Sequence, residues 1–302
     1  MSHEGNISMY YGAYALQNAL EVAEDGDAIC LSGGTFQGTN ITKAIALYGT
    51  GIDVSDPTYI INNFNITIDG IHQFSMEGVR CTGEIVINGN LSNIQFLKCE
   101  FYCVYYASSL QTDVLFSNCK LNGRINYIGT TSTIFLNSFI QYPYVSETGK
   151  TRAQFINCVV SYPWDPSIGN SKYSDFINCV ISTTKNNSNS LVSTCSAKNC
   201  VSINFSDAWK NASVKTNCKS ATFEDVFKDF SGVYADTCTF ELTDSAKTIF
   251  LGLDGTEVGI YGGSFPYDPT PTNPQITRCT VASKSTADGK LSVDIEVNGN
   301  KQ

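Results

Sequence analysis

Residues 155–158 read Phe-Ile-Asn-Cys, and the same four residues return at 176–179. The steps between the final positions of this repeat are 20, 19, 20, 21, 21 and 18 residues. A unit that recurs at a nearly fixed spacing is typical of a solenoid, in which each repeat packs only on its neighbours. Five other segments keep the pattern wholly or in part: Phe96-Leu-Lys-Cys99, Phe116-Ser-Asn-Cys119, Phe135-Leu-Asn-Ser138, Ala197-Lys-Asn-Cys200 and Lys215-Thr-Asn-Cys218.

Each repeat has the right length for one coil of a parallel β-helix. Short runs rich in β-branched and aromatic residues separate the repeated corners, as at 114–116 and 133–136. We expect the phenylalanines to point inward and to stack about 4.8 Å apart along the axis. The asparagines mark the bend, because asparagine tolerates the left-handed conformation and its amide can bond to the asparagine of the next coil. The sequence therefore predicts an all-β, right-handed parallel β-helix of about ten coils.

The two ends of the chain depart from the repeat, as the capping units of a solenoid do. Apolar residues recur at helical spacing within 13–24, which predicts a helix that caps the first coil. A second short helix is expected near 223–230, and strands are expected at 275–299 around an Ala-Asp-Gly turn. We interpret 1–302 as one domain, with the cap helix at 13–24, coils at 28–220, and further coils and a C-terminal cap at 221–302.

Two segments resemble known β-helix proteins. Residues 16–36 (LQNALEVAEDGDAICLSGGTF) resemble the start of pectate-lyase-like β-helix proteins, where a cap helix, a Gly-Asp turn and a strand ending in glycine lead into the coils. Residues 251–276 (LGLDGTEVGIYGGSFPYDPTPTNPQI) resemble the C-terminal part of secreted β-helix proteins of gut Bacteroidetes. The resemblance implies the fold but no particular activity, because one fold hosts many functions.

Composition and charge exclude several classes of partner. The formal net charge is −9 and no Lys/Arg cluster is present, which disfavours nucleic acids and anionic membrane surfaces. No apolar run approaches the ~18 residues of a transmembrane helix. The N-terminal residues contain neither the basic nor the apolar region of a signal peptide. We expect an extracellular or cell-surface protein whose signal peptide is not part of this chain, and a cytoplasmic location also fits.

Cysteine is abundant, with twelve residues, and an even count can indicate disulfides. Six of them, however, share the corner position, and Ser138 occupies the seventh. A small buried packing residue accounts for both cysteine and serine, so we predict buried reduced thiols. Cys99 with Cys103, and Cys195 with Cys200, have only a loose zinc-ligand spacing without a paired CxxC or a nearby histidine. We therefore expect no metal and no cofactor.

Recognisable catalytic signatures are missing. The chain has only two histidines, His3 and His72, and neither has a plausible partner for Ser-His or Cys-His catalysis. The N-T-D, D-D, G-H-G and R-I-K motifs of polygalacturonase-like enzymes do not occur, and the W-x-D-H and R-x-P-x-x-R motifs of pectate lyases do not occur. These observations favour a protein without enzymatic activity.

Aromatic residues that follow the corners form the candidate binding face. Tyr-Pro-aromatic triplets occur at 142–144 and 162–164, 20 residues apart, which predicts that they stack side by side on one outer face. Exposed rings with a polar edge suit sugar rings, which offer C–H faces and hydroxyls. The alternative is that these rings pack a long loop against the coils. The candidate ligand-binding residues are Tyr105, Tyr142, Tyr144, Tyr162 and Trp164.

Three functions are compatible with this face. The first, which we favour, is binding of a polysaccharide or other glycan without catalysis. The second is an enzyme on the same face. A lyase would use Lys150 or Arg152 as base and Arg124 to bind a uronate carboxylate, and a hydrolase would use two of the carboxylates Glu147, Asp165 and Asp175. The third is a structural spike or adhesin, which its oligomeric state would reveal.

Overall fold

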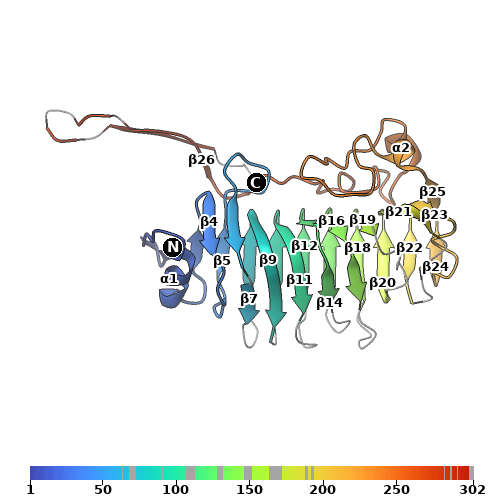
Figure 1. Ribbon diagram of the computed structural model, residues 1–302, viewed down its shortest axis with the longest axis horizontal. Coiled ribbons are helices and arrows are strands. Elements are labelled where there is room, and N and C mark those ends of the chain that lie inside the picture. The colour runs from blue at the N-terminus through green and yellow to red at the C-terminus, as the bar shows by residue number, and fades with distance from the viewer. Residues whose placement is uncertain are drawn as a thin grey trace.

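The computed structural model describes residues 1–62, 64–67, 73–89, 91–106, 113–127, 132–145, 152–162, 172–187, 190–191, 194–281, 283–285, 288–290 and 292–298. It is nearly all β, and its strands stack along one axis as a right-handed parallel β-helix (Figure 1), which confirms the predicted fold class. Within the described residues, the coils build two long sheets, and each sheet contains ten parallel strands along its main path.

The first sheet contains the strand that precedes each asparagine corner. Its parallel strands are β3 (Ala28–Cys30), β5 (Ala46–Tyr48), β8 (Phe74–Glu77), β10 (Ile94–Leu97), β12 (Val114–Ser117), β15 (Thr133–Leu136), β18 (Ala153–Ile156), β20 (Ser174–Ile177), β22 (Ser196–Lys198) and β24 (Val214–Thr216). A small antiparallel hairpin, β1 (Ser2–His3) and β2 (Asn6–Ile7), extends the sheet beyond β3.

The second sheet contains the strand that follows each corner. Its strands are β4 (Gly34–Gln37), β6 (Thr58–Ile61), β9 (Val79–Asn88), β11 (Glu100–Tyr106), β13 (Lys120–Leu121), β16 (Phe139–Gln141), β19 (Val159–Tyr162), β21 (Val180–Asn187), β23 (Val201–Phe205) and β25 (Lys219–Ala221). Three further strands form part of a third face: β7 (Phe64–Thr67), β14 (Ile125–Tyr127) and β17 (Pro143–Val145). Strand β7 pairs with the far end of β9, β14 pairs with the far end of β11, and β17 pairs with β14.

A ladder of phenylalanine rings runs through the core between the sheets. In β15 and β18, Phe135 pairs with Phe155, and their ring centroids are 4.8 Å apart with planes 11° from parallel. The Phe155 and Phe176 rings are likewise 4.8 Å apart, and all three side chains are fully buried. The prediction that the rings point inward and stack is therefore confirmed. Because five successive coils, from β10 to β20, each contribute a ring at the same strand position, the ladder fixes the register of these coils.

The asparagine corners have the predicted left-handed conformation. Asn118, Asn137, Asn157 and Asn178 have φ between 45° and 56°. The predicted bond between asparagines of adjacent coils occurs at Asn178, whose Nδ2 donates to Asn157 Oδ1 at 3.0 Å. Other corner amides bond instead to the C-terminal part of the chain, which the repeat pattern alone did not predict.

Residues after β25 add no further coil in the described part of the chain, which corrects the expectation of C-terminal coils at 221–302. They form α2 (Phe223–Val226), α3 (Ala246–Ile249) and irregular segments that fold back over the second sheet (Figure 1). The outer face of that sheet is apolar here, so it needs a cover. A second hydrophobic core lies between them, built from Phe139, Val159, Val180 and Val201 of the sheet and Phe227, Phe230, Phe240 and Ile260 of the cover.

A C-terminal strap, residues 249–273, runs along the asparagine corners against the order of the coils. Leu251 O accepts a hydrogen bond from Asn199 at 2.9 Å, and Ile260 O accepts one from Asn137 at 2.8 Å. Near its end, Thr272 donates to the buried carboxylate of Glu77 through both its backbone N–H and its hydroxyl. The strap thereby satisfies corner groups that would otherwise be buried without a partner.

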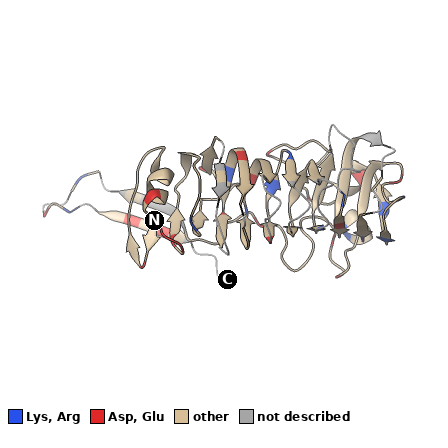
Figure 2. Cartoon of the chain, turned by 90° about the horizontal axis from the view of Figure 1, so that it is seen from below, with Lys and Arg blue, Asp and Glu red and all other residues tan. Residues whose placement is uncertain are grey.

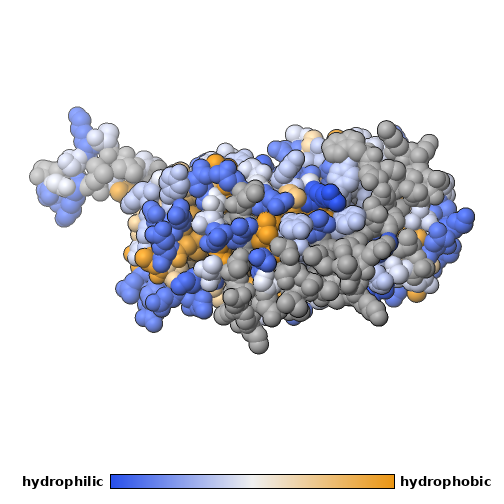
Figure 3. Space-filling view, turned by 60° about the horizontal axis from the view of Figure 1, so that its bottom comes forward, coloured by the Kyte–Doolittle hydropathy of each residue, from blue (hydrophilic) through white to orange (hydrophobic). Residues whose placement is uncertain are grey.

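The two ends of the stack have different caps. Helix α1 (Ala15–Val22) places Leu16, Ala19 and Leu20 against the first coil, as predicted. Hydrophobic residues gather on the surface toward this N-terminal end (Figure 3), and Ile7 and Met9 are largely exposed there. The predicted C-terminal strands are present as an antiparallel hairpin that projects from the body (Figure 1), made of β26 (Gln275–Val281) and β27 (Val293–Asn298).

Replacing Phe155 by alanine tests the ring ladder. The change removes a fully buried ring that stacks on two others, so we expect a loss of about 3–5 kcal/mol of unfolding free energy. Urea unfolding of Phe155→Ala measures the loss, with Gln154→Ala as control because Gln154 is exposed on the same strand. Equal stability of the two variants would show that the rings do not stack in the core.

Thiol reactivity tests the interior cysteines. Cys99, Cys119, Cys158, Cys179 and Cys200 are buried free thiols, as predicted. Burial raises the pKa of Cys119 to about 12, so almost no reactive thiolate forms at neutral pH. We expect a maleimide reagent to label the exposed Cys30 in the native protein and these five only after denaturation. Peptide mass spectrometry reads the labelled positions, and native labelling of Cys119 or Cys158 contradicts the packing described here.

Candidate functional site

The third face is formed by the far ends of β9 and β11, which extend beyond the second sheet, together with β7, β14 and β17. The inward row Ile85, Val104, Ile125 and Pro143 is buried and anchors this face to the core. The next position on each strand therefore points outward. The outward row, in register from one coil to the next, is Asn65, Val86, Tyr105, Asn126 and Tyr144.

Two glycines allow the chain to turn from the second sheet onto the third face. A Cβ atom on Gly83 would lie 1.8 Å from Asn62 O, and one on Gly123 would lie 1.6 Å from Tyr102 O. Backbones of neighbouring coils therefore touch at this bend, and only glycine fits. Because Glu84 and Arg124 follow these glycines directly, the turn places both charged residues at the border of the third face.

Tyr105, Asn126 and Tyr144 form a row of polar and aromatic side chains on three successive coils. Tyr105 is 38% exposed, and Asn126 and Tyr144 are half-buried. The two tyrosines stand two coil spacings apart, about 10 Å along the axis. The asparagine between them offers both a donor and an acceptor. This arrangement presents two rings and one amide along a straight line parallel to the axis.

A charged row borders the tyrosine row at the bend. Its residues Glu84, Cys103 and Arg124 lie on successive coils, and Cys103 Sγ donates to Glu84 Oε2 at 3.7 Å. Partial burial, followed by the negative charge of Glu84, raises the pKa of Cys103 to about 11, so the thiol stays protonated and serves as a donor. The Arg124 guanidinium carbon lies 5.1 Å from the Tyr144 ring centroid, which is a cation–π contact.

Arg124 is the main positive group of this face. It is exposed, and no described carboxylate pairs with it. The cation–π contact orients the guanidinium over the tyrosine row without using its hydrogen-bond donors. In Figure 2, lysine and arginine are scattered along the body, so Arg124 does not belong to a broad basic surface among the described residues. A single available guanidinium suits one anionic group of a ligand.

The structure separates the two tyrosines that were predicted to stack. Tyr142 has a φ of 54° and lies between β16, which ends at Gln141, and β17, which begins the third face at Pro143. Tyr162 continues β19, pairs with Thr183 of β21, and is only 2% exposed. Tyr162 therefore belongs to the core and does not contribute a ring to the surface, because β19 extends one residue farther than β16. Tyr142 is half-buried, and its carbonyl oxygen accepts a hydrogen bond from Ile125 N at 3.2 Å.

Four of the predicted site residues lie outside the described residues: Glu147, Lys150, Trp164 and Asp165. Arg152 and Asp175 lie elsewhere, on the first sheet, where the guanidinium binds the carboxylate through two hydrogen bonds and Ser196 donates a third. Partial burial alone would raise the pKa of Asp175, but these hydrogen bonds outweigh it and hold that pKa below its ordinary value. A carboxylate held in its charged form is a poor general acid.

The second sheet carries a largely buried charged row that was not predicted from the sequence. Arg80, Glu100 and Lys120 pair in register and lie under the C-terminal cover. Lys120 Nζ binds both oxygens of Asp53 at 2.9 and 3.0 Å, and Arg80 Nε lies 3.2 Å from Glu100 Oε2. Burial raises the pKa of Glu100 despite the charge of Arg80. Tyr234 of the cover donates to Glu100 Oε1 at 3.2 Å, so the row also contacts the cover. The spacing of 20 residues was the signal that could have found the row.

Comparisons with known proteins leave the function open. No protein-family model matches the chain, and no curated protein matches it. Among solved structures, the pectin methylesterase from Aspergillus niger in deglycosylated form is similar at a TM-score of 0.42 and 18% identity, over 79% of this chain and 90% of that chain. The same enzyme in penultimately deglycosylated form, with an N-acetylglucosamine stub at its own glycosylated asparagine, gives a TM-score of 0.41 and 17% identity, over 80% and 92%. A likeness of this size carries no conclusion about activity, and it does not support the resemblance to Bacteroidetes proteins.

In the ranges that the structure describes, no group of three or more His, Cys, Asp or Glu side chains could hold a metal ion. No described helix is both long and apolar enough to cross a bilayer. On the third face, rings, an amide and opposite charges lie on neighbouring coils in register.

Replacing Gly123 by alanine tests the bend that creates this face. The added Cβ would collide with Tyr102 O, so we expect a loss of about 1–3 kcal/mol of unfolding free energy. Thermal and urea unfolding provide the measurement. The neighbouring Arg124→Ala is the control, because an exposed side chain contributes little to stability. A Gly123→Ala protein as stable as the parent would mean that the coils do not touch here.

Proposed function

We propose that this protein binds a polysaccharide along the third face, with the glycan chain parallel to the axis of the β-helix. The observation that carries the proposal is the register of Tyr105, Asn126 and Tyr144 on three adjacent coils. Sugar rings present apolar C–H faces and hydroxyl edges, and tyrosine rings with an amide between them match both. An extracellular or cell-surface location belongs to this proposal, because polysaccharides are encountered there.

The charged border gives the proposed ligand its chemical class. The exposed guanidinium of Arg124 can bind a carboxylate through two parallel hydrogen bonds. It is held over the ring of Tyr144, which stands at one end of the row of Tyr105, Asn126 and Tyr144. A polysaccharide that carries an occasional uronate therefore fits better than one with a carboxylate on every sugar, because the protein as a whole carries a net charge of −9.

The carboxylates on the described part of the third face favour binding without catalysis over hydrolysis. A glycosidase needs two carboxylates on either side of the bond that breaks, about 5–10 Å apart. On the described part of the third face, Glu84 is the carboxylate beside the tyrosine row, and it accepts a hydrogen bond from Cys103. The predicted acid Asp175 is paired with Arg152 on another sheet. The described residues thus supply the contacts of a binding surface but not a carboxylate pair.

Replacing Tyr144 by alanine tests the proposal. The variant loses a ring on the ligand path and the cation–π support of Arg124, so we expect binding of a uronate-containing polysaccharide to weaken by about 1–3 kcal/mol. A glycan array identifies the ligand, and calorimetry on Tyr144→Ala and Tyr105→Ala measures the loss. Tyr14→Ala is the matched control, because Tyr14 is 61% exposed beside the cap helix.

Stability measurements on the same variants separate binding from packing. The proposal expects unfolding of Tyr105→Ala to match that of the parent closely, because its ring is 38% exposed. Unchanged glycan affinity in both tyrosine variants, together with a lowered melting temperature, would mean that the rings only pack the face.

A further inference from the structure

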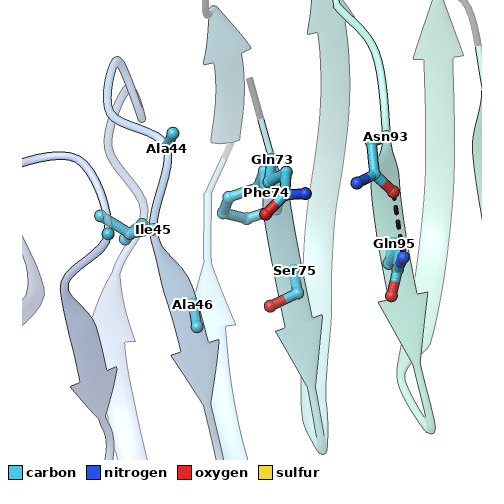
Figure 4. A pocket seen from close by; sticks show the side chains of 9 residues that line it. Ala44, Ile45, Ala46, Gln73, Phe74, Ser75, Asn93 and Gln95 are labelled. Atoms are coloured by element: carbon cyan, nitrogen blue, oxygen red, sulfur yellow. Dashed lines mark hydrogen bonds between the residues drawn. The ribbon is translucent and has the colours of Figure 1, made fainter. Parts of the chain in front are cut away.

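A separate cavity of about 280 Å³ opens on the first sheet near its N-terminal end. It lies over the beginnings of β5, β8 and β10, three neighbouring strands (Figure 4). The small side chains of Ala44 and Ala46 form one side, and Gln73, Ser75, Asn93 and Gln95 form the other. Larger residues in place of the two alanines would fill this volume.

The polar side chains of the cavity are fixed by the register of the coils. Ala46, Ser75 and Gln95 pair in sequence across β5, β8 and β10, so their outward side chains form one row. Asn93 precedes this row with a φ of 56°, the same left-handed corner conformation that asparagine adopts elsewhere in the coils. Gln95 Nε2 donates to Asn93 Oδ1 at 3.0 Å, which holds the two amides in one arrangement (Figure 4).

This amide pair leaves several groups available to a ligand. The remaining Gln95 carbonyl oxygen is an acceptor, the Asn93 Nδ2 group is a donor, and the Ser75 hydroxyl can be either. No described residue hydrogen-bonds to the side chains of Ser75 or Gln73. Donors and acceptors therefore converge on the cavity from two neighbouring coils, about 4.8 Å apart.

The cavity contains no ionisable side chain among its lining residues. A charged ligand would lose hydration there without gaining a partner of opposite charge. A neutral ligand with several hydroxyls, each both donor and acceptor, matches amides and a hydroxyl at this spacing. We propose that this cavity binds one neutral sugar unit of an oligosaccharide, at a site distinct from the tyrosine row and independent of it.

Exchange of Gln95 for leucine tests the site. Leucine has a similar size, and Leu115 occupies the same row position on the next coil, so the fold tolerates the change. Saturation-transfer NMR with neutral methyl glucosides, galactosides and mannosides on the full chain provides the measurement. We expect binding of at least one glycoside, with affinity about tenfold weaker in Gln95→Leu and in Ser75→Ala.

Two controls keep this result distinct from the third face. Gln154→Leu makes the same exchange in the same row three coils away, and we expect it to retain parental affinity. Tyr144→Ala is also expected to retain it, even if that variant loses polysaccharide binding. The site assignment is overturned if no neutral glycoside binds, or if Gln95→Leu and Ser75→Ala bind like the parent. Preference of the cavity for a simple amide such as N-methylacetamide over every glycoside overturns the sugar assignment.

Discussion

In-register pairing of successive coils is the constraint on which the rest of this structure depends. Phe135, Phe155 and Phe176 stack at 4.8 Å because the strands that carry them pair residue to residue. A shift of one residue in any coil would turn a buried ring outward and a polar side chain inward. The same register aligns residues on the surface, since positions at equal distance from the corner form rows. The tyrosine row, the buried charged row and the amide cavity are all consequences of it.

The C-terminal part of the chain protects the stack without adding to it. Parallel coils leave corner amides and an apolar outer sheet face that need partners. The cover supplies Phe230 and Phe240 against Phe139, and the strap supplies backbone groups to the corner asparagines. The cover lies on the second sheet, and the strap lies along the asparagine corners. The third face and the outer side of the cavity on the first sheet stay open, and these are the two surfaces to which we assign ligands.

The fold was predictable because the repeat appears directly in the sequence. Phe155-Ile-Asn-Cys158 and its relatives gave the coil length, the inward rings, the left-handed corners and the buried thiols. The site was predictable only in part. Counting residues from the corner assumes that the strand after the corner has the same length in every coil, and this length differs between coils. Tyr105 and Tyr144 do lie in one row, yet Tyr162 is buried since β19 continues where β16 stops. The path of the strap could not be predicted, because its contacts join residues that are far apart in the sequence, such as Asn137 and Ile260, and follow no period.

The dependence of affinity on ligand length tests the central claim most directly. If a polysaccharide lies along the axis over coils about 4.8 Å apart, each added sugar reaches new contacts until the chain spans Tyr105 and Tyr144. Calorimetric titration of size-graded oligosaccharides should therefore show affinity that rises with length and then levels off, with the plateau reached at shorter length in Tyr105→Ala. Affinity that does not depend on length, or a length dependence that Tyr105→Ala leaves unchanged, would contradict a ligand path along the third face.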